Sequence, residues 1–234
     1  MLPGSTIVRA CPTCAVPVLQ HTLMSGNTFG ARFWTDGWRE APMLPDQPWL
    51  VKCPKCSALF WIDEAQQLAE IEPGLRPSQD ERRYEDAGDV EPPCAEDYHD
   101  FIPHVHGDQE KERYVRTRAW WASNTKRREH PSSASPITEA ERGNLESLLG
   151  LIGDEEPGDV IMKAEITREL GRFDECQRLL QGEFEDRYGP AVELIRRLAG
   201  ERQACVAEIT FGEKDDAGDG SKPRHRRSRP SQKK

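Results

Sequence analysis

Hydrophobic positions follow two different periods in the two parts of this chain. Residues 1–62 contain short alternating runs separated by glycine and proline, which is the two-residue period of β-strands. From residue 138 onward, apolar side chains recur at helical spacing, first at Leu145, Leu148, Leu149 and Ile152. The pattern predicts an α+β protein, with a small β-rich domain followed by an α-helical domain.

Turn and cap signals refine the β-rich part. Asp36-Gly37 lies between two short apolar runs and predicts a two-residue β-hairpin turn. Residues 59–61 predict a strand that returns toward the start of the domain. Asp63, with Gln66 three residues later, predicts the N-cap of a short helix that ends at Pro73-Gly74.

Caps also divide the helical part. Thr138 and Glu141 form a capping-box pattern, and the next helix is expected from about residue 157 to residue 170. Asp174 is expected to cap another helix, and Gly189-Pro190 to open a further one.

Shifts in composition set the expected domain boundaries. Residues 73–107 have dispersed charge, Pro92-Pro93 and little periodicity, which indicates a linker. The expected organisation is a β-rich domain at 1–72, a linker at 73–107, a basic aromatic helix at 108–130, a helical domain at 131–212 and a disordered basic tail at 213–234.

The most specific chemical signal is a pair of Cys-Pro-X-Cys motifs, which contribute Cys11, Cys14, Cys53 and Cys56. Two residues between cysteines let the backbone fold into a knuckle that aims both thiolates at one point, where backbone amides can donate to the sulfurs. Two such knuckles supply a tetrahedral shell of four sulfurs, which suits Zn²⁺. A filled shell leaves no position for water, so the expected Zn²⁺ is structural and stabilises the fold.

The motifs resemble those of the zinc-ribbon family, including the proline after the first cysteine of each pair, over residues 9–62. The insert between the motifs has 38 residues, against roughly 15–20 in many such sites. The hairpin predicted at Asp36-Gly37 accounts for this insert. Arg9, Lys52 and Lys55 lie near enough in sequence to offset the negative charge of four thiolates around one Zn²⁺.

Two other chemistries compete with a structural zinc site. Cys11-Pro-Thr-Cys14 alone is also compatible with a redox dithiol. That chemistry uses a cysteine at a helix N-terminus, whereas residues 15–19 have a β-like pattern interrupted by proline. A rubredoxin-like iron site is the other alternative for the four sulfurs.

The remaining cysteines give weaker hypotheses. A second metal site would use Cys94, His99, His104 and His106. Their spacing matches no standard site, so solvated loop residues are the alternative interpretation. Cys176 and Cys205 lie in or near apolar helical positions and are expected to be small core residues.

Aromatic residues are concentrated in the β-rich domain. They include Trp34, Trp38, Trp49, Trp61, Phe29, Phe33 and Phe60. Together with nearby basic residues they are compatible with a stacking surface for single-stranded nucleic acid or with a protein-docking face. They are equally compatible with the core of a small domain that has few aliphatic residues.

Basic residues are concentrated in two places, although the chain has a formal net charge of −9. Trp120-Trp121 lies among arginines in the predicted 108–130 helix, where packing between domains is the expected role. Residues 222–234 hold seven Lys/Arg and no acid, which leaves −16 on the rest of the chain. Such a tail can bind nucleic acid weakly, fold back on the acidic body or stay solvated.

One segment resembles the turn between the two helices of a tetratricopeptide repeat. In that family a glycine is followed two residues later by an aromatic and three after that by a small residue. Gly171, Phe173 and Cys176 fill these places, and Leu180 lies at the next helical contact. The resemblance covers residues 157–190, about one repeat, and implies a module that binds proteins or peptides.

The sequence contains no nucleophile–base pattern, phosphate-binding glycine loop or open metal site, so a non-catalytic protein is expected. It also lacks an apolar run near the roughly 18 residues of a membrane span and an apolar signal segment, so a cytoplasmic address is expected. The combination resembles bacterial proteins that join a zinc ribbon to a helical-repeat half. The leading hypothesis is a zinc-stabilised adaptor that binds a protein partner through its helical half. The alternative is a nucleic-acid-associated protein that uses the aromatics and the basic tail.

Overall fold

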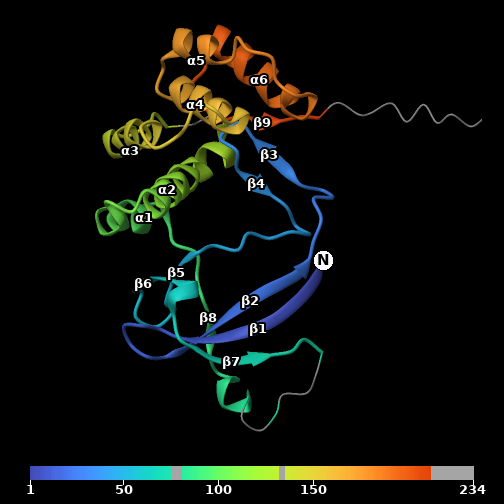
Figure 1. The fold of residues 1–234 in the computed structure, drawn as a ribbon, viewed down its shortest axis with the longest axis vertical. Coiled ribbons are helices and arrows are strands. Elements are labelled where there is room, and N and C mark those ends of the chain that lie inside the picture. Colours follow the sequence, from blue (N-terminus) through green and yellow to red (C-terminus); the bar gives the residue numbers. More distant parts are fainter. Residues whose placement is uncertain (75–77, 79–80, 132–134, 212–234) are drawn as a thin grey trace, which may run out of the picture.

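The computed structural model describes residues 1–74, 78, 81–131 and 135–211 (Figure 1). The basic tail predicted at 213–234 lies outside these residues. The strands are β1 (Leu2–Ala10), β2 (Pro17–Ser25), β3 (Arg32–Trp34), β4 (Arg39–Glu40), β5 (Leu50–Lys52), β6 (Leu59–Trp61), β7 (Gln67–Ile71), β8 (Gly88–Asp89) and β9 (Glu208–Ile209).

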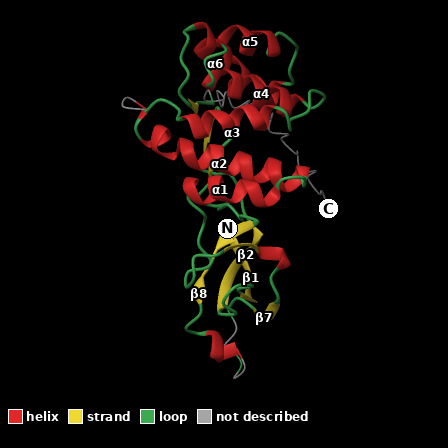
Figure 2. Ribbon diagram, turned by 90° about the vertical axis from the view of Figure 1, so that its left-hand side faces the viewer, coloured by secondary structure: helices red, strands yellow, loops and turns green. Residues whose placement is uncertain are grey.

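The α-helices begin at residue 95 and lie together at one end of the molecule, with the β1–β2 sheet at the other (Figures 1 and 2). They are α1 (Ala95–Phe101), α2 (Gln109–Glu129), α3 (Glu139–Leu149), α4 (Pro157–Glu169), α5 (Phe173–Leu179) and α6 (Gly189–Gly200). Short 3₁₀ turns are η1 (Ile62–Glu64), η2 (Glu81–Tyr84), η3 (Ile102–Val105) and η5 (Asp186–Tyr188). An N-terminal sheet followed by helices agrees with the predicted α+β class.

The largest sheet has the strand order β7-β1-β2-β8. The short helix predicted after Asp63 is wrong, because only the 3₁₀ turn η1 forms there and residues 67–71 become β7. β7 pairs antiparallel with β1, with Ile71 opposite Thr6. The local cap signal is overridden because β1 offers a strand edge whose backbone groups residues 67–71 satisfy.

The insert between the cysteine motifs extends to the helices. The predicted hairpin forms between β3 and β4, but its loop has three residues, 35–37, and not two, because the Trp34 N–H donates to the Trp38 carbonyl at 3.0 Å. Of the loop residues only Gly37 has a positive φ, of 80°, which glycine adopts without strain. β3 also pairs with β9, with Phe33 opposite Ile209. The sheet β4-β3-β9 therefore joins the insert to the end of the helical part.

Residues 73–107 contain more structure than the predicted linker. β8 pairs in parallel with β2, and α1 packs against α2. Tyr98 of α1 is 2% exposed and lies in one cluster with Leu50 of β5 and Val115 of α2. Because only a few side chains of this segment are buried, its sequence shows little periodicity.

Two predicted helix starts are confirmed. Asp108 is the N-cap of α2, where its side chain accepts a hydrogen bond from the backbone N–H three residues later. Thr138 and Glu141 form the capping box of α3. The prediction for α5 is wrong, because its N-cap is Arg172 and not Asp174.

The turn between α4 and α5 is centred on Gly171, which has a φ of 79°. Phe173 and Leu180 then pack into the cluster that joins α4, α5 and α6. α5 spans seven residues. Its C-terminal carbonyl at Leu180 accepts a hydrogen bond from the Arg196 side chain at 2.9 Å, which satisfies the helix end.

Buried side chains form four neighbouring clusters along the molecule. One surrounds the cysteine motifs, and a second joins β5, α1 and α2. A third joins α2, α3 and α4, and the fourth joins α4, α5 and α6. Since α2 and α4 each contribute to two clusters, contacts run continuously from the sheet to the last helix.

Candidate metal centre

Two hairpins bring the four cysteines of the paired motifs together. Residues 11–14 lie in the turn between β1 and β2, and residues 53–56 lie in the turn between β5 and β6. The ligating atoms of Cys11, Cys14, Cys53 and Cys56 all lie within 4.8 Å of one another. Within the described ranges, they form the only group of three or more metal-ligating side chains at such distances.

The two turns have the same backbone pattern. The N–H of Cys11 donates to the Val16 carbonyl at 2.9 Å, and the N–H of Ala15 donates to the Cys11 carbonyl at 2.8 Å. The equivalent bonds in the second turn measure 2.9 and 3.0 Å, with Ser57 in the place of Ala15. Ala15 and Ser57 have φ angles of 56° and 59°, the left-handed conformation that costs a non-glycine residue about 1 kcal/mol or more.

The sulfur atoms are spaced like the ligands of one tetrahedral ion. Cys11 Sγ lies 3.7 Å from Cys56 Sγ, and Cys14 Sγ lies 3.8 Å from Cys53 Sγ. Four sulfurs at roughly 2.3 Å from a central ion lie about 3.8 Å apart in a regular tetrahedron. A disulfide would bring two sulfurs to about 2.05 Å, and all four of these cysteines are free thiols. The four cysteines can therefore hold a metal ion.

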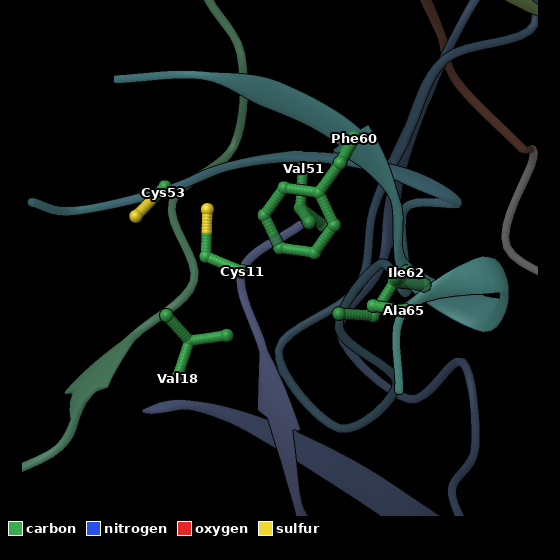
Figure 3. Packing of buried hydrophobic residues seen from close by; sticks show 7 residues of the cluster. All are labelled: Cys11, Val18, Val51, Cys53, Phe60, Ile62 and Ala65. Carbon is green, nitrogen blue, oxygen red and sulfur yellow. The ribbon is translucent and has the colours of Figure 1, made fainter. Parts of the chain in front are cut away.

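The centre lies between an apolar cluster and the surface. Figure 3 shows the Cys11 and Cys53 side chains beside Val18, Val51 and Phe60, and both cysteines are at most 1% exposed. Cys14 is half-buried and Cys56 is exposed. One side of the site is thus excluded from water while the other remains accessible.

The thiols cannot all ionise without a cation between them. Burial raises the pKa of Cys11, but hydrogen bonds from backbone N–H groups and the neighbouring thiols lower it by more. The net result is a pKa of about 7, below the ordinary value of cysteine. At Cys56 the backbone N–H of Ala58 lowers the pKa, whereas burial and the other three sulfurs raise it, to about 12. A bound divalent cation removes this conflict because it stabilises all four thiolates at once.

Two of the three cations expected to offset the thiolate charge have other partners. Lys52 forms an ion pair with Asp97 at 3.0 Å. Arg9 donates to the Ala65 carbonyl at 3.0 Å. Lys55 forms no ion pair with any described residue. Arg9 and Lys52 thus connect neighbouring segments around the centre.

The second metal site proposed around residues 94–106 does not assemble in the part of the chain that the structure describes. Cys94 is the N-cap of α1. His99 lies 3.4 Å from the Ser123 hydroxyl, and His106 lies 3.5 Å from Glu112. The second site is therefore not supported, but the alternative interpretation as solvated loop residues is also wrong in part, because His99 lies in α1 and His104 in η3.

The predictions for the two remaining cysteines have opposite outcomes. Cys176 is 0% exposed in the cluster of α4, α5 and α6, so its core role is confirmed. Cys205 is exposed, so its predicted core role is wrong. It follows α6, where its carbonyl accepts a hydrogen bond from Arg168 at 3.0 Å.

Most aromatic residues of the β-rich part are used for packing. Trp34 and Phe60 are buried, which confirms the core interpretation for these two. Trp61 packs against Phe101 and Tyr114. Trp49 is 47% exposed but stacks on Tyr114, with ring centroids 5.0 Å apart, and Phe29 is 84% exposed.

Trp121 joins α2 to the insert, as expected for packing between domains, whereas Trp120 packs among the helices. Trp120 is 3% exposed, and its indole N–H donates to Glu169 at 3.0 Å. The indole N–H of Trp121 donates to the main-chain carbonyl of Asp36 at 2.8 Å.

A buried charged network, which the sequence analysis missed, lies where the hairpin meets α2 and α4. Asp36 forms an ion pair with Arg128, and Glu165 forms one with Arg168. Glu169 is 4% exposed and accepts hydrogen bonds only from neutral donors, the Trp120 indole and the Asn124 amide, in the described chain. No periodic signal reveals this network, because its members come from the hairpin, α2 and α4 and meet only in the folded chain.

Burial dominates the electrostatics of this network. It raises the pKa of Asp36 and lowers that of Arg128, although each attracts the other. It also raises the pKa of Glu169 well above its ordinary value, and repulsion from Glu165 and Asp36 adds to the rise. Three carboxyl groups therefore share two guanidinium partners, and burial favours the protonated form of Glu169.

Comparisons with family models, curated proteins and solved structures return no match for this chain. The described helices include none that is long and apolar enough to cross a membrane.

Proposed function

We propose that this chain is a non-catalytic adaptor that a structural Zn²⁺ stabilises and that binds a protein partner through its helical half. The observation that carries the proposal is the grouping of the four cysteine sulfurs, which all lie within 4.8 Å of one another, with 3.7 Å between Cys11 and Cys56 and 3.8 Å between Cys14 and Cys53. A four-sulfur shell is closed, so the ion would join two hairpins and bind no substrate. Zinc-ribbon and tetratricopeptide-like architecture is part of the same proposal.

The charge of the helical half supports a protein partner. Residues 138–211 contain seventeen acidic and nine basic residues, a formal net charge of −8. Exposed members on or near α5 and α6 include Asp174, Glu183 and Glu193. An acidic surface repels phosphate and attracts Lys/Arg-rich segments, so the proposed partner presents a basic face.

The basic composition of residues 222–234 supports a second candidate, a nucleic-acid-associated protein. The aromatic packing does not favour it, because Trp34 and Phe60 are buried and Arg32 pairs with Glu208. This candidate therefore depends on the tail, and binding through the tail would weaken steeply with salt.

A pull-down from native lysate distinguishes the two candidates. Tagged full-length chain and a chain ending at residue 212 are compared with and without nuclease. The adaptor proposal expects the same discrete, stoichiometric protein in all four samples. Recovery that disappears with nuclease or with the tail contradicts the adaptor and supports nucleic acid.

Charge reversals then locate the binding surface. Asp174→Lys combined with Glu193→Lys should reduce recovery of the partner at least tenfold, because both exposed carboxylates lie on the helical half. Glu70→Lys combined with Glu72→Lys changes the charge equally on the exposed sheet side and should leave recovery unchanged. Equal effects of the two pairs would contradict binding through the helical half.

A further inference from the structure

The outer part of the β1–β2 hairpin lacks strand partners on both edges. β7 pairs with residues 6–9 of β1, and β8 pairs only with Val18 and Leu19 of β2. Residues 2–5 and 20–25, called the arm below, therefore have only each other as strand partners in the described structure. An isolated two-stranded hairpin is marginally stable in water, so the arm is a surface on which further strand pairing is favourable.

Alternate backbone groups of β2 point away from β1 and form its open edge. The Leu19 carbonyl accepts a hydrogen bond from the Val90 N–H at 3.1 Å, on the side opposite β1. The register shift between Pro3 and Thr6 places the extra residue on β1, so the alternation along β2 continues as far as Leu23. The second shift, between Leu2 and Pro3, places an extra residue, Met24, on β2 after this point. The backbone groups of His21 and Leu23 therefore point off the sheet, and no described backbone group pairs with them there.

The arm and the loop beside it carry no formal side-chain charge. Residues 1–8 and 18–31 contain no Asp, Glu, Lys or Arg, in a chain of which 31% is charged. The exposed large apolar side chains in and beside these segments are Met1, Leu2, Met24, Phe29 and Met43. Met43 belongs to the same surface, since its carbonyl accepts from the Asn27 N–H at 3.2 Å. Exposed edges of natural sheets usually carry proline, lysine or other charged residues that prevent pairing, and residues 20–25 of β2 include none of these.

We propose that the open edge of β2 pairs with β2 of a second copy of this chain. Antiparallel pairing about a two-fold axis places Leu23 opposite Leu23 of the partner subunit, where the two residues exchange N–H···O=C bonds. The two sheets then become continuous and the arm gains a partner along its open edge.

Charge favours a second copy at this place. Two copies that each carry −9 repel one another over most of their surfaces, and residues 138–211 hold most of that charge. The arm is the part of the described surface where two copies meet without opposing like charges. Asp89, the nearest acidic residue on β8, is already bonded to His21 at 2.8 Å.

Light scattering coupled to size exclusion tests this pairing on the full, zinc-loaded chain with its thiols kept reduced. The expected mass is twice 26.6 kDa at high concentration and falls to that of one chain on dilution. Met24 is 67% exposed, so Met24→Lys adds a charge to each copy beside the paired edge and should shift the species to a single chain. Phe211→Lys, at a 55% exposed position outside the arm, is the matched control and should leave the mass doubled.

Two results would overturn the proposal. One is a single-chain mass for the unmodified protein at every concentration. The other is a doubled mass that Met24→Lys does not reduce. If Met24→Lys loses zinc or structure, hydrogen exchange of the unmodified chain decides instead. Amides of residues 21–25 should exchange at least tenfold more slowly at high concentration, and a rate independent of concentration refutes the pairing.

Discussion

Asp36 and Arg128 lie 92 residues apart in sequence and form an ion pair whose side chains are 0% and 6% exposed. One carboxylate oxygen of Asp36 accepts from the Trp38 N–H at 3.0 Å and shapes the hairpin turn. The other accepts from Arg128 and from the Asn124 amide, both on α2. A single turn residue therefore determines both the local conformation of the hairpin and its position against the helices.

Arg128→Met should destabilise the protein by about 3–5 kcal/mol. The change leaves Asp36 buried without its cation, close to two further buried carboxyl groups. Urea unfolding followed by circular dichroism measures the loss. Lys126→Met lies on the exposed side of the same helix and should change stability by less than about 0.5 kcal/mol. Equal effects of the two variants would show that the buried ion pair is not needed to position the hairpin.

Glu169 should make the protein less stable as the pH rises. Burial raises its pKa well above the ordinary value, so the folded state keeps a proton that the unfolded chain releases near pH 4.3 or so. The contribution of Glu169 to the free energy of unfolding is fully present below the pKa that the group has in the unfolded chain. It is lost as the pH rises through the pKa that the group has in the folded state. Groups that face it are Trp120, Asn124 and Arg128 on α2, Glu165 and Arg168 on α4, and Asp36 on the hairpin.

Glu169→Gln should remove this loss because glutamine stays neutral and retains hydrogen bonding to Trp120 and Asn124. The variant should remove a decline in the free energy of unfolding of at most about 1.4 kcal/mol per pH unit. Urea unfolding from about pH 6 to about pH 9 measures this slope. Glu141→Gln is the control. The pKa of Glu141 is lowered, since Arg127 and Thr138 outweigh its burial, so its stabilisation is lost only as the pH falls through that low pKa. A Glu169→Gln profile parallel to that of the unmodified protein would disprove the role of this proton.

Cys14→Ser should reduce bound zinc from one ion per chain to well below one. It removes one of four ligands that close the site, and structural zinc sites contribute on the order of 10 kcal/mol to folding. Elemental analysis of protein purified with reductant gives the metal content, and tryptophan fluorescence reports the fold. Cys94→Ser, at an exposed cysteine outside the group, should retain one zinc per chain. Iron in place of zinc, or an unmodified chain without metal, would contradict the zinc assignment.

Ser57→Gly should stabilise the zinc-loaded protein by about 1 kcal/mol. Ser57 has a φ of 59°, a conformation that glycine adopts without the clash of a Cβ. Thermal unfolding at fixed zinc concentration checks the gain. Ala58→Gly changes the next residue, which has no positive φ, and should destabilise by roughly 0.5–1 kcal/mol because glycine is more flexible when unfolded. Destabilisation by Ser57→Gly would mean that the serine side chain stabilises the fold by more than its left-handed backbone conformation destabilises it.

Signals confined to a few neighbouring residues predicted their structures well. The Thr138 capping box forms as expected, and a hairpin forms at Asp36-Gly37 with a loop one residue longer than predicted, because the interactions that define both lie within four residues. The cysteine motifs likewise predicted their own grouping, since each knuckle orients two sulfurs locally and only one meeting of the two knuckles satisfies all four. These features depend on covalent spacing and on hydrogen bonds between neighbouring residues, so the sequence is enough to predict them.

Features that depend on distant partners could be decided only by the tertiary structure. Residues 67–71 become a strand because β1 offers an edge, and residues 95–101 form a helix that packs on α2, although their own patterns indicate a helix and a linker. Asp36, Glu165 and Glu169 are charged side chains whose burial is stable only because Arg128, Arg168 and two neutral donors surround them. Sequence by itself determined which residues could form turns, caps and a four-sulfur site, whereas the pairing of strand edges and the desolvation of charges required the whole fold, because both depend on contacts between residues far apart in the chain.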